Sequence, residues 1–127
     1  MALAKYDKNA VSGEYTLFIA NSLRKVYCLI ERDSKRAWTL VASWAAEKRH
    51  IFASVKFLDD FPYKENEVNL VEYRMSRPVI MALRADASLV SATCNYNYDG
   101  TRSSSDSFIA SLASTDPFTL ITKGCYR

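Results

Sequence analysis

The chain has 127 residues, 49% of them hydrophobic, which is enough to build one domain around a packed core. The formal net charge is +3, and the lysines and arginines are scattered along the chain, so we expect no nucleic-acid partner. No apolar run approaches the roughly 20 residues that cross a bilayer, so we expect no membrane insertion. Residues 1–10 lack the apolar core of a signal peptide, which is typical of either a cytosolic chain or a mature or trimmed one.

Three apolar segments follow one another between Gly13 and Trp44. They are rich in β-branched and aromatic residues, and short polar breaks at Asn21–Ser22 and Glu31–Lys35 separate them. This pattern is typical of consecutive strands joined by tight turns. The predicted strands are Tyr15–Ala20, Val26–Ile30 and Trp38–Trp44.

Alternation within these segments predicts which side chains face the core. The second strand places Val26, Cys28 and Ile30 on one face. The first strand is largely apolar on both faces, which indicates a strand that is covered on both sides.

The middle of the chain predicts one more strand and a helix. A fourth strand is expected at Ile51–Phe57, and an irregular segment follows it. Val68–Tyr73 is either a strand or the lead-in to the helix that comes next. That helix is expected over Arg77–Ala85, because Ser76 is suited to the N-cap and Pro78 misses no backbone hydrogen bond in the first turn.

Further strands are predicted in the last part of the chain. They are expected at Leu89–Tyr98, Phe108–Ala113 and Phe118–Thr122, and Asp99-Gly100 is a strong turn signal after the first of them. The sequence therefore predicts a single α+β domain over residues 1–127, with residues 1–11 as a lead-in. We expect a mostly antiparallel sheet with one or two short helices.

Motifs of known catalytic sites are absent from the sequence. It contains one histidine, His50, next to two basic residues, where a surface role is favoured over that of a catalytic base. It has no glycine-rich phosphate loop, no His-Glu-x-x-His motif and no Gly-x-Ser-x-Gly motif. We therefore expect that the protein is not an enzyme.

An acidic segment runs from Asp59 to Glu67. Calcium prefers several oxygen ligands, and this segment supplies four carboxylates and the amide of Asn66. The spacing matches no EF-hand, and a solvated loop explains the composition as well. The candidate calcium ligands are Asp59, Asp60, Glu65 and Glu67.

A run of alternating asparagine and tyrosine precedes the Asp99-Gly100 turn. Tyrosine offers a flat apolar face with a polar tip, and the neighbouring amides and carboxylate offer hydrogen bonds, so this surface suits a sugar. The alternative is a strand end with packed tyrosines before a turn. The candidate ligand-binding residues are Asn95, Tyr96, Asn97, Tyr98 and Asp99.

Several motifs resemble fibrinogen-related domains. In that family the order is Ser-Gly-x-Tyr-x-Ile, Val-Tyr-Cys-Asp-Met and Gly-Gly-Trp-Thr-Leu-Ile. The corresponding residues here are Ser12-Gly13-x-Tyr15-x-Leu17, Val26-Tyr27-Cys28 and Trp38-Thr39-Leu40-Val41. The run from Trp38 to Ser43 is particularly similar to the intelectin branch. Later segments resemble shorter ectodomains of marine invertebrates, namely Phe61–Glu67, Tyr73–Ser76 and Ala92–Tyr96.

The chain also departs from the family pattern. Leu29-Ile30 stands in place of Asp-Met, Arg36-Ala37 stands in place of Gly-Gly, and residues 2–11 contain no upstream cysteine. Most of the family's calcium site and ligand pocket lies in a C-terminal part that has no counterpart here. The resemblance implies a truncated fibrinogen-like fold, but most of the family's binding residues do not carry over, and fold alone does not license function.

From the resemblance we expect a non-enzymatic, secreted or ectodomain recognition module. Its expected partners are glycans, as for a lectin-like domain of innate recognition, or a protein surface, as in cell adhesion. The alternative is a structural domain that forms a homo-oligomer through strand edges or through a free cysteine.

The three cysteines allow two interpretations. By analogy with secreted sheet domains, we expect a disulfide between Cys94 and Cys125, which would stabilise the fold by about 3–4 kcal/mol. Cys28 would then be buried in its strand or bonded to another chain. In a cytosolic protein all three would be buried thiols.

Overall fold

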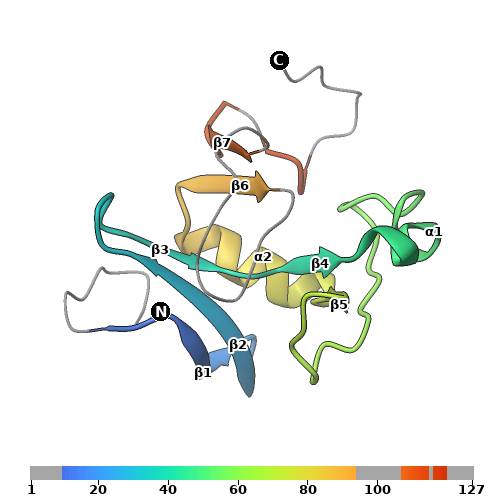
Figure 1. Cartoon of the computed structure of the whole chain (residues 1–127), viewed down its shortest axis with the longest axis horizontal. Coiled ribbons are helices and arrows are strands. Elements are labelled where there is room, and N and C mark those ends of the chain that lie inside the picture. The colour runs from blue at the N-terminus through green and yellow to red at the C-terminus, as the bar shows by residue number, and fades with distance from the viewer. Residues whose placement is uncertain (1–9, 94–106, 115, 120–127) are drawn as a thin grey trace.

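Three small antiparallel sheets and two short helices make up the fold in a computed structural model that describes residues 10–93, 107–114 and 116–119 (Figure 1). The elements are β1 (Gly13–Ile19), β2 (Ser22–Glu31), β3 (Arg36–Thr39), β4 (Ala42–Trp44), the 3₁₀ turn η1 (Ala46–Lys48), α1 (Arg49–Phe52), β5 (Glu72–Arg74), α2 (Arg77–Asp86), β6 (Leu89–Thr93) and β7 (Ser107–Ser111). The sheets are β1-β2-β3, β4-β5 and β6-β7. The predicted α+β class with mostly antiparallel strands is confirmed.

The β1–β2 hairpin turns on two residues with positive φ, Ala20 at 50° and Asn21 at 64°. Such turns follow the right-handed twist of the flanking strands. The outer face of β1 carries exposed residues, and Phe18 is 68% exposed. The expectation that β1 is covered on both sides is therefore wrong, because the core packs against one face of this strand only.

The predicted strand Trp38–Trp44 is divided between two sheets. β3 pairs with β2, whereas β4 pairs with β5, and in Figure 1 the two follow one another along the chain. At the junction Leu40 N–H donates to the Tyr27 carbonyl, and Met75 N–H donates to the Val41 carbonyl. The alternation of apolar and polar residues in the sequence continues through this junction, but the strand that the chain pairs with changes from β2 to β5.

The strand expected at Ile51–Phe57 is wrong. η1 and α1 occupy residues 46–52, and turns follow. The residues from Ala45 to Arg49 favour helix more than strand. Phe52 is 2% exposed and packs against other aromatic rings. It is the one buried residue of the segment, so the segment has no alternating buried face.

The core lies between the first sheet and α2, and Tyr73 of β5 and Phe118 complete it. The inner face of β2 contributes Val26, Cys28 and Ile30, as predicted. The helix contributes Val79, Ile80 and Leu83, and Ile80 is 1% exposed. Ser76 is the N-cap residue and Pro78 lies in the first turn, so the predicted helix start is confirmed. The undecided segment Val68–Tyr73 becomes a strand only at its end, where β5 begins.

The first two late strands follow the prediction as far as the structure describes them, and the described part of the third does not. β6 and β7 pair from Leu89 opposite Ser111 to Thr93 opposite Ser107. Residues 117–119 form a turn where a strand was expected, and Arg84 of α2 anchors it with an ion pair of 2.6 Å to Asp116. Among the described residues, no helix has the length and apolarity needed to span a membrane.

Cys28 is a buried free thiol that is 1% exposed. Burial raises its pKa from 9.0 to about 11, although a hydrogen bond with Thr39 partly offsets this. The unfolded thiol therefore ionises before the folded thiol as the pH rises, so the stability that this difference contributes is present below about pH 9 and lost as the pH approaches 11.

We expect the free energy of unfolding of the unmodified protein to fall through this window relative to that of Cys28→Ala. Urea unfolding at pH values on both sides of the window measures the difference between the two proteins. Every other group of the chain is the same in the two proteins, so its contribution cancels in the difference. Parallel pH curves for the two proteins would contradict the expectation.

Candidate functional site

The predicted ligand-binding residues Asn95, Tyr96, Asn97, Tyr98 and Asp99 lie outside the described residues, and so do both partners of the predicted disulfide, Cys94 and Cys125. The glycan site at this turn and the disulfide therefore stay predictions.

The acidic segment contacts the start of α2. An Asp60 oxygen accepts a hydrogen bond from Arg77 N–H, and a Glu65 oxygen accepts one from Ser76 N–H, each at 2.9 Å. These contacts cap the helix, since the Ser76 side chain makes no capping bond.

The other two candidate calcium ligands have different surroundings. Asp59 accepts a hydrogen bond from Lys56 N–H at 3.2 Å, and the Glu67 carbonyl accepts one from Asn69. Across the described ranges, no three His, Cys, Asp or Glu side chains gather where they could hold a metal ion. Calcium binding by this segment stays a prediction.

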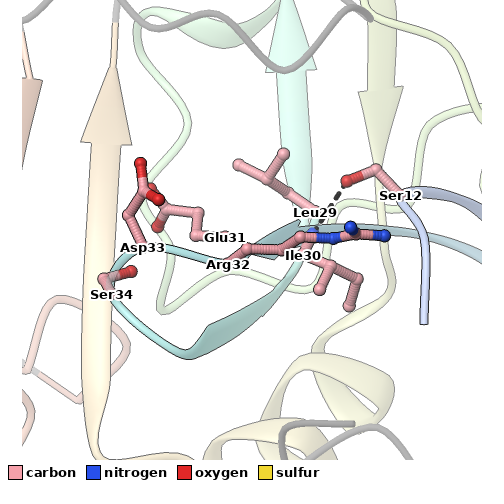
Figure 2. A pocket seen from close by; sticks show the side chains of 7 residues that line it. All are labelled: Ser12, Leu29, Ile30, Glu31, Arg32, Asp33 and Ser34. Carbon is pink, nitrogen blue, oxygen red and sulfur yellow. Dashed lines mark hydrogen bonds between the residues drawn. The ribbon is translucent and has the colours of Figure 1, made fainter. Parts of the chain in front are cut away.

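A polar pocket of about 310 Å³ lies at the turn between β2 and β3 (Figure 2). Ser12, Arg32, Asp33 and Ser34 line it together with the last three residues of β2, Leu29, Ile30 and Glu31. The Ser12 hydroxyl accepts a hydrogen bond from Ile30 N–H at 2.8 Å, and Glu31 accepts one from the Trp38 indole. Ser12 thus ties the start of β1 to β2, and Glu31 ties β2 to β3. None of the described residues that line the pocket is aromatic.

An exposed, well-anchored tryptophan distinguishes the second sheet. Trp44 ends β4 and is 41% exposed. One face of its indole stacks on Phe52, with ring centroids 5.2 Å apart and an angle of 11° between the planes. Phe52 in turn meets Tyr63 edge-on at 5.3 Å. Phe52 therefore fixes one face of the Trp44 ring, and the ring remains accessible to a ligand.

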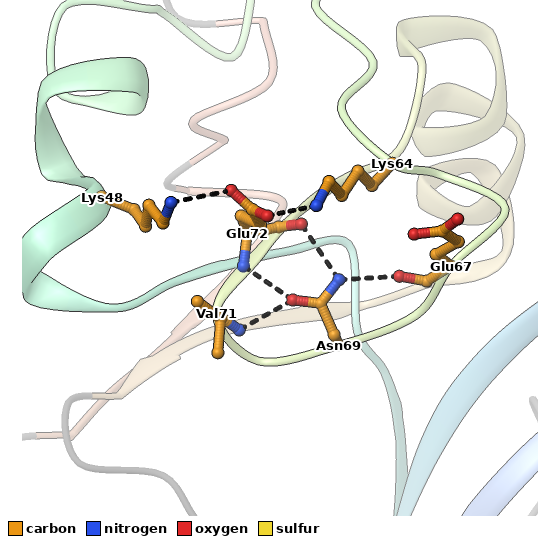
Figure 3. Close-up of polar contacts among 6 residues, drawn as sticks. All are labelled: Lys48, Lys64, Glu67, Asn69, Val71 and Glu72. Atoms are coloured by element: carbon orange, nitrogen blue, oxygen red, sulfur yellow. Dashed lines mark hydrogen bonds and ion pairs between the residues drawn. The ribbon is translucent and has the colours of Figure 1, made fainter.

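Charged side chains lie directly beside this ring. Trp44 pairs with Glu72 across β4 and β5, so both side chains are on the same face of the sheet. The Glu72 carboxylate binds two ammonium groups, that of Lys48 at 3.4 Å and that of Lys64 on its other oxygen (Figure 3). We call Trp44, Lys48, Lys64 and Glu72 the Trp44 surface.

The electrostatics keep the Trp44 surface charged. The hydrogen bond from Lys64 lowers the pKa of Glu72 below its ordinary value, and the nearby charge of Lys48 acts in the same direction. The same hydrogen bond raises the pKa of Lys64. At neutral pH the surface therefore presents a carboxylate between two ammonium groups.

Asn69 organises the backbone that carries Glu72 (Figure 3). Its side-chain oxygen accepts hydrogen bonds from Val71 N–H and Glu72 N–H at 2.9 and 2.7 Å. Its amide nitrogen donates to the Glu67 and Glu72 carbonyls at 2.7 and 3.1 Å. One side chain thus closes the turn before β5 and sets the position of Glu72.

Replacing Asn69 with alanine is expected to lower the free energy of unfolding by about 2 kcal/mol, because four hydrogen bonds are lost at a partly buried turn. Urea unfolding measures the loss. Asn66→Ala is the matched control, since Asn66 is exposed and its loss should cost less than about 0.5 kcal/mol. Equal effects of the two variants would contradict the role given to Asn69.

The sequence placed the candidate sites elsewhere and missed the Trp44 surface. Trp44 and Glu72 are far apart in the chain, and β4–β5 pairing alone brings them together. One local signal in the sequence points to this turn. Asn69 precedes Val71 and Glu72 by two and three residues, the spacing at which an asparagine side chain binds backbone N–H groups.

Comparison of this chain with protein-family models, with curated proteins and with solved structures finds no match. The resemblance to fibrinogen-related domains therefore stays a prediction.

Proposed function

We propose that this protein is a non-enzymatic extracellular recognition module that binds glycans through the Trp44 surface. The observation that carries the proposal is an exposed indole, fixed from below by Phe52, beside the ion-paired cluster of Lys48, Lys64 and Glu72. The extracellular location rests on the resemblance to fibrinogen-related domains and on the predicted disulfide.

The chemistry of sugars explains why this surface is suited to them. A pyranose ring has an apolar face of C–H groups and an edge of hydroxyl groups. The indole offers an apolar surface for the face, and the ammonium and carboxylate groups offer donors and acceptors for the hydroxyls. Because Phe52 already fixes the ring, little side-chain freedom is lost on binding, which favours affinity.

Trp44→Ala is expected to weaken glycan binding by at least about tenfold, because the apolar platform is removed. A glycan array identifies bound sugars, and titration calorimetry compares the affinities of the two proteins. Phe18→Ala is the matched control, since Phe18 is an exposed aromatic residue of the first sheet. Undiminished binding by Trp44→Ala would exclude the Trp44 surface as the site.

Running the array with calcium and again with EDTA tests the predicted calcium ligands. Loss of binding in EDTA would support a role for Asp59, Asp60, Glu65 and Glu67, and unchanged binding would remove calcium from the proposal. Silence under both conditions would overturn glycan binding and leave recognition of a protein surface.

A second candidate function is assembly through a strand edge. Phe18 and Leu23 pair across the β1–β2 hairpin and are 68% and 73% exposed, and β1 pairs only with β2 in the described part of the chain. The thiol of Cys28 is buried and out of reach of a second chain, so within the described residues the strand edge is the route to assembly. Light scattering of Phe18→Lys tests this: an oligomer that dissociates supports assembly, and a monomeric parent protein overturns it.

A further inference from the structure

We propose that the Trp44 surface selects neutral saccharides, by holding adjacent hydroxyl groups between its carboxylate and its ammonium groups without a metal ion. This inference rests on the proposed function and names the class of sugar that the same site would take. It follows from the charge balance of the surface and from the donors and acceptors that its ion pairs leave available.

The charges around Trp44 balance. On β4, η1, α1, β5 and the loop of residues 63–71, the charged side chains are equal in number. The basic ones are Lys48, Arg49, Lys64 and Arg74, and the acidic ones are Glu47, Glu65, Glu67 and Glu72. His50, in α1, is exposed and adds no charge when neutral. A ligand with a net charge would gain little Coulomb energy from such a neutral group of charges and would still lose its hydration.

Hydroxyl groups match the free hydrogen-bonding capacity of the ion-paired cluster. Each ammonium group has three donors, and Glu72 accepts from one ammonium on each oxygen. Further donors on both lysines and further lone pairs on the carboxylate therefore remain. A hydroxyl can accept from an ammonium group and donate to the carboxylate at the same time, which neither an acidic nor a basic ligand group can do.

The position of the cluster next to the indole supplies the second contact. Glu72 lies directly across the strands from Trp44, and Lys48 lies in η1, which follows β4 closely. A sugar whose C–H face covers the indole would thus have hydroxyls of its edge next to Glu72 and its two lysines. The ion pairs fix these side chains before the ligand arrives, so the lysine side chains lose little further freedom.

The test uses the full chain and immobilised polysaccharides in the presence of EDTA. The neutral probes are galactan, mannan and glucan, and the acidic probes are a polyuronate and heparin, which separate carboxylate from sulfate. We expect binding to at least one neutral probe and at least tenfold weaker binding to both acidic probes. Acidic probes that bind as tightly as the neutral ones would overturn the inference while leaving glycan recognition intact. Binding to neither class in EDTA would overturn the metal-free inference, and binding to neither class when calcium is supplied as well would overturn the proposed function itself.

Glu72→Gln provides the sharper variant. This variant keeps the hydrogen bonds between the Asn69 side chain and the backbone of residue 72, but it leaves the two lysines without a counter-charge. We expect at least tenfold weaker binding to the neutral probe and a gain on the acidic probes. Loss of binding to all probes, or no change on any, would overturn the assigned role of Glu72.

Lys64→Gln is the companion variant if Glu72→Gln fails to fold, since Lys64 is more exposed than Glu72. It removes one donor and leaves the surface with a net negative charge. We expect weaker binding to the neutral probe without any gain on the acidic probes. A gain on the acidic probes would overturn the inference.

Discussion

Replacing Ile80 with alanine is expected to lower the free energy of unfolding by about 3–4 kcal/mol, the middle of the range for buried aliphatic truncations. Ile80 is 1% exposed in α2 and belongs to the cluster that also contains Val26 and Cys28 of β2. Truncation removes buried methyl and methylene groups and leaves a cavity between the helix and the first sheet. The neighbouring strands are packed too closely to move in and fill this cavity completely.

The midpoint of urea unfolding measures this loss, and an unchanged slope shows that the folded state is retained. Leu23→Ala is the matched control, because Leu23 is an aliphatic residue that is 73% exposed and should cost less than about 0.5 kcal/mol. Small domains have only about 5–15 kcal/mol of total stability, so Ile80→Ala should also lower the melting temperature markedly. A loss no larger than that of Leu23→Ala would contradict the packing of α2 on the first sheet.

Replacing Arg74 with methionine is expected to cost about 3 kcal/mol, because this side chain is the hydrogen-bonding centre of a loop. Arg74 is 2% exposed, and its guanidinium group donates to the Lys56 and Asp59 carbonyls at 2.7 Å each. It also lies 5.0 Å from the centre of the Phe57 ring. Methionine keeps the length of the side chain but leaves both carbonyl groups without their donor.

Two further variants decide whether the hydrogen bonds or the charge of Arg74 matter. Arg74→Lys keeps the charge but not the planar group that reaches two carbonyls and covers Phe57, so we expect it to recover less than half of the loss. Arg36→Met is the control at an exposed position of β3. Full recovery by lysine would show that charge alone stabilises the loop, and it would contradict the geometric role.

Tyr73, the neighbour of Arg74 in β5, shows how the same strand tolerates an unpaired polar atom. Tyr73 is fully buried, and its hydroxyl has no hydrogen-bond partner within the described residues. Burial raises the pKa of this hydroxyl, and the nearby Glu65 carboxylate acts in the same direction. The hydroxyl therefore stays protonated at any ordinary pH, and the ring fills core volume without adding a charge.

Local alternation predicted the parts of the fold in which one face of an element meets the core. The three β2 residues expected to share one face, Val26, Cys28 and Ile30, do join the core cluster, and the start of α2 was also correct. Tyr27 and Leu29 on the other face of β2 are buried too, because this strand is the central one of its sheet. The segment Ile51–Phe57 failed because a short apolar run does not distinguish a strand from a turn of helix. The prediction of one strand over Trp38–Trp44 missed its division between two sheets, because alternation does not reveal which strand lies alongside.

For the candidate site, the sequence determined which chemical groups are present and the tertiary structure decided which of them meet. Composition alone identified the acidic segment. In the structure, however, Asp60 and Glu65 accept hydrogen bonds from the backbone at the start of α2 and cap the helix. Trp44 and Glu72 became neighbours only through β4–β5 pairing, with Lys48 and Lys64 converging on the same carboxylate. The physical reason is the range of each effect: periodicity and turn chemistry act over a few residues, whereas the Trp44 surface depends on strand pairing between distant segments.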